Sequence, residues 1–89
     1  MDNTYVTYVM SDTENRITAI NSNAFLLDTD GWTEIDRGSG DKYLHAQGHY
    51  FPHPIYTNDG ICRYKLENGT AMERTPEEIA ADMVRLINS

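Results

Sequence analysis

The sequence predicts an α+β fold in a single domain of 89 residues. Two N-terminal runs are rich in β-branched and aromatic residues, which are typical of strands. Asp-Gly and Asn-Gly dipeptides separate three later apolar runs, as in β-hairpins. A helix-start signal then precedes an apolar stripe near the C-terminus. A chain of this length fills only one apolar core, so residues 1–89 are expected to form one unit.

Residues 1–37 are predicted to form a hairpin followed by a short strand. Residues 5–10 and 16–20 are the two hairpin strands, and the polar residues 11–15 connect them. Residues 24–27 are a short apolar run expected to join the core as a strand or a helical turn. Residues 32–36 are expected to form the third strand, with Trp32 and Ile35 near the core despite an imperfect alternation.

Residues 38–54 are predicted to be a long connection without regular periodicity. Asp41 is expected to cap one helical turn that runs through Gln47, and Gly48 is expected to end it. The two prolines that follow favour extended backbone at the residues before them.

Residues 55–74 are predicted to form a three-stranded meander. The expected strands are residues 55–57, 61–66 and 71–74, and the turns contain Asp59-Gly60 and Asn68-Gly69.

Residues 75–88 are predicted to form an amphipathic helix. Thr75 suits the cap, Pro76 the first helical position and Glu78 the third position of a capping box. An apolar stripe follows at helical spacing, formed by Ile79, Met83, Leu86 and Ile87. Burial in the core is expected for this stripe, and docking on a partner is the alternative.

Charge and cysteine content narrow the function classes. Seven basic residues against fourteen acidic ones give a formal charge of −7, which disfavours nucleic acid and anionic membranes and favours basic or neutral protein partners. A single cysteine, Cys62, forms no intramolecular disulfide, which predicts folding in the cytoplasm. Neither a signal peptide nor a membrane span is expected from the polar start and the absence of a long apolar run.

Residue types that carry chemistry are present without a diagnostic pattern. His45, His49 and His53 are four residues apart, as in a zinc site on one helix, but Gly48 and the prolines oppose that helix. Cys62 lies within a predicted strand and is expected to be a small buried residue. Glu34, Asp36 and Asp41 are expected to be solvated, and glycine-rich phosphate loops, serine elbows and Cys-x-x-Cys pairs are absent. We therefore predict no enzyme activity, no catalytic residue, no metal and no cofactor.

The remaining feature is the aromatic stretch between residues 43 and 56. Rigid amphipathic rings are favoured in protein interfaces because they bury area at low entropic cost. The predicted partner-binding residues are Tyr43, His45, Gln47, His49, Tyr50, Phe51 and Tyr56. The alternative, which the sequence leaves open, is that these rings fill the core.

Nearly the whole chain resembles small prophage proteins of Firmicutes. The resemblance is carried by residues 5–8 (Tyr-Val-Thr-Tyr), 31–38 (Gly-Trp-Thr-Glu-Ile-Asp-Arg-Gly), 40–43, 45–48, 50–51, 59–60, 63–66 and 73–82. These residues resemble the XkdW-like proteins, which are encoded among tail-fibre and baseplate genes. The resemblance implies a tail-assembly factor or minor tail component, located in the host bacterial cytoplasm or in the virion tail. It implies a tail-fibre or baseplate protein as the partner.

Two other functions remain open from the sequence. An acidic domain of this size is suited to inhibit a bacterial defence protein, in the manner of an anti-CRISPR, by occupying a cationic channel. A small metal-dependent enzyme that uses the histidines and carboxylates is the second alternative.

Overall fold

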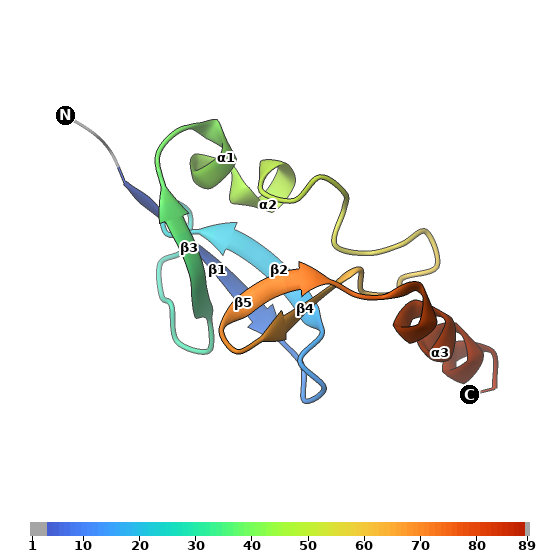
Figure 1. Ribbon diagram of the computed structural model, residues 1–89. Helices are drawn as coiled ribbons and strands as arrows, with labels where there is room; N and C mark the ends of the chain where they lie inside the picture. The colour runs from blue at the N-terminus through green and yellow to red at the C-terminus, as the bar shows by residue number, and fades with distance from the viewer. Residues whose placement is uncertain (1–3, 89) are drawn as a thin grey trace.

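The computed structural model of the chain describes residues 4–88. The elements are β1 (Tyr5–Ser11), β2 (Ile17–Ser22), β3 (Thr33–Gly38), α1 (Asp41–Leu44), α2 (Ala46–His49), β4 (Tyr64–Glu67), β5 (Thr70–Glu73) and α3 (Pro76–Ile87). Figure 1 shows α1 and α2 above one sheet, the β4–β5 hairpin beside that sheet, and α3 extending at the end of the molecule. The predicted α+β class is confirmed.

The predicted N-terminal hairpin forms β1 and β2 of an antiparallel sheet with the order β2-β1-β3. Its turn is held by Asp12, whose Oδ1 accepts hydrogen bonds from the backbone N–H groups of Glu14 and Arg16, both at 2.9 Å. Asn15 adopts φ 63°, a left-handed conformation that asparagine tolerates better than most residues.

Strand β3 begins one residue later than predicted and continues to Gly38. Thr7 pairs with Asp36 while Tyr8 pairs with Glu34, so Ile35 is the extra residue of a β-bulge. The bulge explains the imperfect alternation in the sequence, because one additional residue shifts the faces of the strand.

The core lies between this sheet, the short helices and the β4–β5 hairpin. Its buried residues are Val9, Ile17, Ile20, Ala46 and Tyr64, against which Ile35, Tyr50, Phe51, Ile55, Leu66 and Ala71 pack. The helices are also tied to the sheet by a hydrogen bond of 2.9 Å from Ser22 Oγ to the carbonyl oxygen of Leu44. The sheet therefore fixes the position of the segment that follows β3.

The prediction that residues 24–27 join the core is wrong. Phe25 is 56% exposed and Leu27 is fully exposed. The chain leaves the sheet at Ser22, whose carbonyl oxygen accepts a hydrogen bond from the N–H of Phe25. This turn carries the apolar run over the surface before β3 begins.

The helical turn predicted within residues 38–54 is wrong in its cap and its end. Two short helices, α1 and α2, replace one turn, and Gly48 lies inside α2 instead of ending the helix. Gly40 occupies the cap of α1 with φ 99° and no side-chain cap bond, so Asp41 does not cap. A left-handed φ at the cap favours glycine, which explains why Asp41 moves into the first turn.

Only two of the three predicted meander strands form a sheet. The β4–β5 hairpin turns through Asn68 at φ 53° and Gly69 at φ 79°, as its sequence predicts. The predicted strand at residues 55–57 makes only the bridge between Tyr56 and Cys62. The two sheets are joined by a hydrogen bond of 2.8 Å from Leu66 N–H to the carbonyl oxygen of Asn15.

Helix α3 begins as predicted, but its stripe is not in the core. Thr75 Oγ1 accepts a hydrogen bond from Glu78 N–H, and Glu78 Oε1 accepts one from Thr75 N–H, both at 3.1 Å. No residue of α3 is buried, and Ile87 is 74% exposed. Core burial of the stripe is therefore contradicted.

The polar face of α3 holds the helix against the rest of the molecule. Asp82 is 10% exposed, and its Oδ2 accepts hydrogen bonds from Arg74 at 2.9 Å and Arg16 at 3.0 Å. Lys65 Nζ donates to Glu78 Oε1 at 2.9 Å. Among residues 4–88, no helix is long and apolar enough to span a membrane.

Candidate protein-binding surface

The seven predicted partner-binding residues fall into two groups in the structure. Tyr43, Tyr50 and Phe51 are half-buried, whereas His45, Gln47, His49 and Tyr56 are exposed. Both alternatives left open by the sequence therefore have a physical basis, because some rings pack inward while other side chains face outward.

The inward group anchors residues 43–51 to β3 and the core. The rings of Phe51 and Tyr64 stack with centroids 3.9 Å apart and planes at 12°. The Tyr50 hydroxyl donates to Asp36 Oδ2 at 2.8 Å, and the Tyr43 hydroxyl donates to the same oxygen at 3.4 Å. The pKa of Tyr50 is raised above its usual range, mainly by burial and to a smaller extent by the hydrogen bond to Asp36.

Gly38 allows the close approach of this anchor. A Cβ atom at Gly38 would lie 2.5 Å from the ring of Tyr43, which is shorter than any normal carbon contact. The Lys42 ammonium lies 4.8 Å from the centroid of the Tyr50 ring, within the range of a cation–π contact. Ring packing thus fixes α1 tightly against the end of β3.

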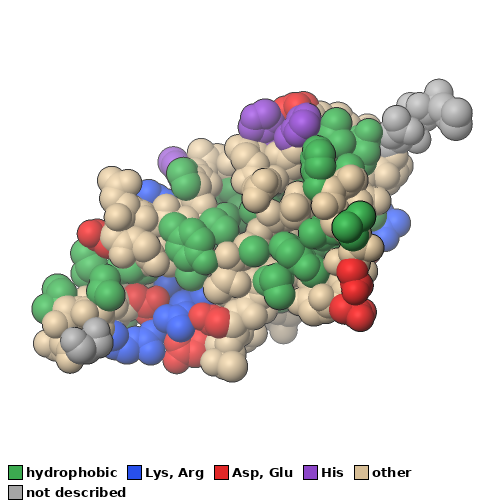
Figure 2. Space-filling view, turned by 180° about the vertical axis from the view of Figure 1, so that it is seen from behind, with side chains coloured by type: hydrophobic (Ala, Val, Ile, Leu, Met, Phe, Trp, Pro, Cys, Tyr) green, Lys and Arg blue, Asp and Glu red, His purple; other side chains and the backbone are tan. Residues whose placement is uncertain are grey.

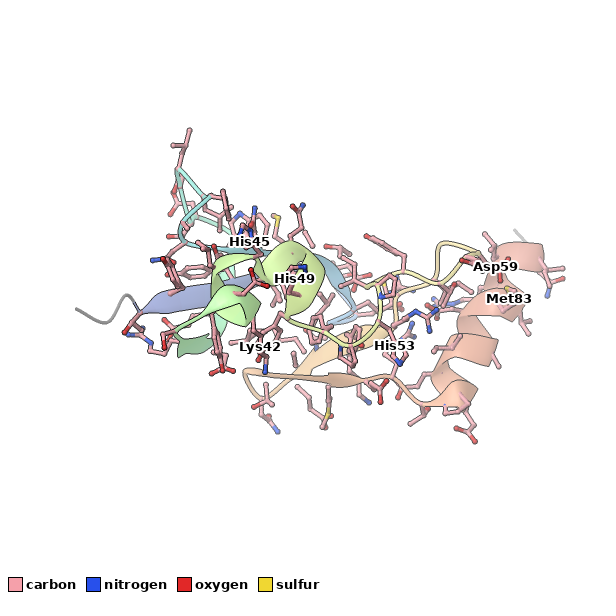
Figure 3. The ribbon with its side chains drawn as sticks, turned by 90° about the horizontal axis from the view of Figure 1, so that it is seen from above. Lys42, His45, His49, His53, Asp59 and Met83 are labelled. Atoms are coloured by element: carbon pink, nitrogen blue, oxygen red, sulfur yellow. The ribbon has the colours of Figure 1, made fainter. Side chains whose placement is uncertain are left out.

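The outward group begins with an aromatic and imidazole cluster. His45 stacks on Phe25 with ring centroids 5.7 Å apart and meets His49 edge-on at 5.9 Å. The Asp41 carboxylate contacts His49 Nδ1 and lies 3.7 Å from His45 Nε2. Figure 3 shows His45 and His49 on neighbouring turns above the sheet, with His53 further along the chain.

Two shallow hollows extend from this cluster across the molecule. The first has a volume of about 470 Å³ and is lined by Asn21, Phe25, Asp41, His45, Gln47, Gly48 and His49. The second has a volume of about 440 Å³ and is lined by Thr18, Ala19, Ile20, Asn21, Trp32, Gln47, Pro54, Ile55 and Tyr56. Because both hollows include Asn21 and Gln47, they form one continuous surface.

We name this the aromatic surface and define it by Phe25, Trp32, His45, Gln47, His49 and Tyr56. Figure 2 shows a face of the molecule on which histidines lie at one edge and hydrophobic side chains spread across the middle. The Tyr56 hydroxyl donates to the carbonyl oxygen of Thr18 at 2.8 Å, which fixes the ring at the far end of the second hollow. The surface therefore combines rigid rings with polar side chains able to donate and accept hydrogen bonds.

The other chemical candidates occupy separate places. In residues 4–88, no group of three or more histidines, cysteines or carboxylates is arranged to hold a metal ion. Burial raises the pKa of the Cys62 thiol. Glu34 forms an ion pair with Arg37 at 2.8 Å. Asp36 accepts the hydrogen bonds from the Tyr43 and Tyr50 hydroxyls described above.

Sequence reasoning missed the exposed Phe25 and the half-buried Trp32 as members of the surface. Phe25 and Trp32 were assigned to the core because of their apolar character, although Phe25 stands in a short run between two polar turns. The turn-forming polar residues on both sides of residues 24–27 are the available signal for a surface loop.

Comparison with models of protein families, with curated proteins and with solved structures found no match to this chain. The resemblance to XkdW-like proteins therefore remains a prediction.

Proposed function

We propose that the chain is a non-enzymatic accessory protein that binds another protein through the aromatic surface. The observation that carries this proposal is the continuity of the two hollows through Asn21 and Gln47. Exposed rings held by a packed anchor bind with little loss of conformational freedom, which favours their use in recognition. Ligand and partner sites commonly combine aromatic side chains with a few polar groups, as these two hollows do.

The proposed partner is a tail-fibre or baseplate protein of a phage. This choice rests on the resemblance to XkdW-like proteins carried by residues 31–38 and the later segments given above. The proposed role is that of a tail-assembly factor or minor tail component, in the host cytoplasm or in the virion tail.

Affinity purification from phage-producing cells tests this proposal. The tagged chain and its variants are compared by quantitative mass spectrometry of the proteins recovered and of purified particles. Recovery of a fibre or baseplate protein supports the tail role, and presence in particles distinguishes a component from an assembly factor. Recovery of a basic host defence protein instead supports the acidic inhibitor.

A matched pair of variants links the result to the aromatic surface. Phe25→Ser removes a ring of the first hollow, whereas Leu27→Ser removes a fully exposed apolar side chain from the same loop that lines neither hollow. We expect Phe25→Ser to reduce partner recovery about tenfold, as for an interface hot spot, and Leu27→Ser to leave it unchanged. Equal recovery with both variants would place the interface elsewhere.

A further inference from the structure

Helix α3 divides its apolar residues between two sides. Ile79 and Met83 are half-buried beside Thr57 and Ile61, whereas Val84 and Ile87 are exposed. Its polar residues Glu78 and Asp82 contact Lys65, Arg16 and Arg74, as described above. An amphipathic helix of a small domain normally buries its apolar side in the core, whereas no residue of α3 is fully buried.

The outward face includes both exposed side chains and a hollow. Val84 is 55% exposed and Ile87 is 74% exposed. Beside them, a hollow of about 400 Å³ is lined by Thr57, Asp59, Ile61, Arg74, Pro76, Ile79, Ala80 and Met83. The outward face of α3 therefore combines exposed apolar side chains with an open recess beside Met83.

Carboxylates border this face on both sides. Asp59 lines the hollow next to Met83, and Figure 3 shows the two side chains close together at the end of the molecule. Glu77 lies one turn before Ala80 and Ala81, at the opposite border, and two turns before Val84. Within residues 4–88, no basic side chain forms an ion pair with Asp59 or Glu77. Arg74 also lines the hollow, but its guanidinium pairs with Asp82.

We propose that the outward face of α3 is a second docking surface whose occupant is a segment of another protein that carries an apolar stripe flanked by lysine or arginine. The apolar stripe fills the hollow beside Met83 and covers Val84 and Ile87. The basic flanks pair with Asp59 and Glu77, which are otherwise unneutralised. A second copy of this chain fits less well, because it carries the same acidic border and a formal charge of −7.

A hollow lined in part by Thr18, Tyr56 and Asp59 lies between this face and the aromatic surface. The residues changed in the two tests are different, so the two proposals are tested independently. The probes are two fluorescent helical peptides with the same leucine stripe, one flanked by lysines and one by glutamates. Binding to the complete chain is measured by fluorescence anisotropy at physiological salt. We expect the lysine peptide to bind at least about tenfold more tightly than the glutamate peptide, in line with two added charge pairs.

Paired variants assign binding to the α3 face. Val84→Gln with Ile87→Gln removes apolar area without changing charge, and it is expected to weaken the lysine peptide about tenfold. Asp59→Lys with Glu77→Lys is expected to reverse the peptide preference. The matched control is Asp30→Lys with Glu34→Lys, where Asp30 precedes β3 and Glu34 lies within it. It changes the net charge by the same amount as the Asp59 and Glu77 pair, and it is expected to retain the peptide preference.

Three results would overturn the proposal. The first is equal affinity for the two peptides. The second is binding that the Val84 and Ile87 changes do not weaken, with circular dichroism showing that the helix is retained. The third is a dimer in sedimentation that these two changes abolish, since that result would make the face a contact between copies.

Discussion

At the residue scale, Asp36 shows how a side chain expected to be solvated becomes structural. Its Oδ2 accepts hydrogen bonds from the hydroxyls of Tyr43, in α1, and Tyr50, directly after α2. The sequence contains these three residues but not the distance between them, because the contact depends on how the chain turns after Gly40. A polar pattern alone therefore could not separate anchor tyrosines from surface ones.

The Asp36 contact leads to a titration prediction for Tyr50. Burial and the carboxylate both raise the tyrosine pKa above its usual value of about 10. Asp36→Asn should lower that pKa, while burial should still keep it above the usual value. Carbon NMR of the labelled tyrosine rings across alkaline pH measures the shift, and an unchanged Tyr50 titration would contradict the contact.

The same shift fixes a direction for stability. A pKa that is raised in the folded state stabilises the protein below the usual tyrosine pKa, and the contribution is lost as pH rises through the folded value. The Asp36 variant should therefore differ from the unchanged chain most at neutral pH and least at strongly alkaline pH.

Phe51 and Gln47 should respond differently to truncation, although both were predicted to bind a partner. Phe51 stacks on the buried Tyr64, so Phe51→Ala should lower the free energy of unfolding by about 3 kcal/mol. Gln47 is exposed, so Gln47→Ala should change that free energy by less than about 0.5 kcal/mol. Urea unfolding measures both, and a large loss with Gln47→Ala would show that the assignment of inward and outward groups is incorrect.

At the scale of the element, α3 is held by a charged cluster instead of an apolar seam. The Asp82 carboxylate forms ion pairs with Arg16, Arg74 and Arg85. The Arg74 hydrogen bond is the largest cause that lowers the pKa of Asp82 below its usual value near 3.8. This contribution to stability is present above that usual value and is lost as pH falls through the lowered one.

Asp82→Asn should release α3 at neutral pH without unfolding the sheet. The change removes the charge that three arginines share, a loss on the order of 2 kcal/mol for hydrogen bonds to a charged group. Hydrogen exchange of the amides in Pro76–Ile87 should accelerate, while exchange in β1 and β2 should not change. Glu77→Gln is the control, because Glu77 lies outside the cluster, and acceleration with this variant alone would contradict the account.

The start of α3 was predictable because its signal is local. Thr75, Pro76 and Glu78 are close in sequence and make the capping box among themselves. The N-terminal hairpin and the Asn68-Gly69 turn were predictable for the same reason. The orientation of α3 was not, because the partners of Asp82 include Arg16, which lies 66 positions earlier.

The aromatic surface shows the same limit at longer range. His45, Gln47 and His49 belong to one segment and were predicted from it. Phe25 comes from the preceding loop and joins them only through the path that the chain takes after β2. Sequence periodicity describes faces of single elements, so it does not reveal a surface assembled from several loops.

At the scale of the whole molecule, the ion pairs of α3 determine which charges remain at the two proposed surfaces. Four of the seven basic residues are engaged in ion pairs that hold α3 to the rest of the molecule: Arg16, Lys65, Arg74 and, through Glu14, Arg85. Much of the basic charge is therefore neutralised within the molecule, which leaves acidic side chains to border the exposed surfaces. The molecule measures 52 × 25 × 21 Å, with α3 at one end and α1 and α2 over the sheet (Figure 1).

The central claim is that the aromatic surface contacts a protein partner, and site-specific photo-crosslinking in phage-producing cells tests it most directly. A photoreactive phenylalanine derivative replaces Gln47 on this surface or, as the control, the exposed Thr13 of the β1–β2 turn. We predict a covalent adduct with a tail-fibre or baseplate protein from position 47 and none from position 13. No adduct from position 47, or equal adducts from both positions, would contradict the account.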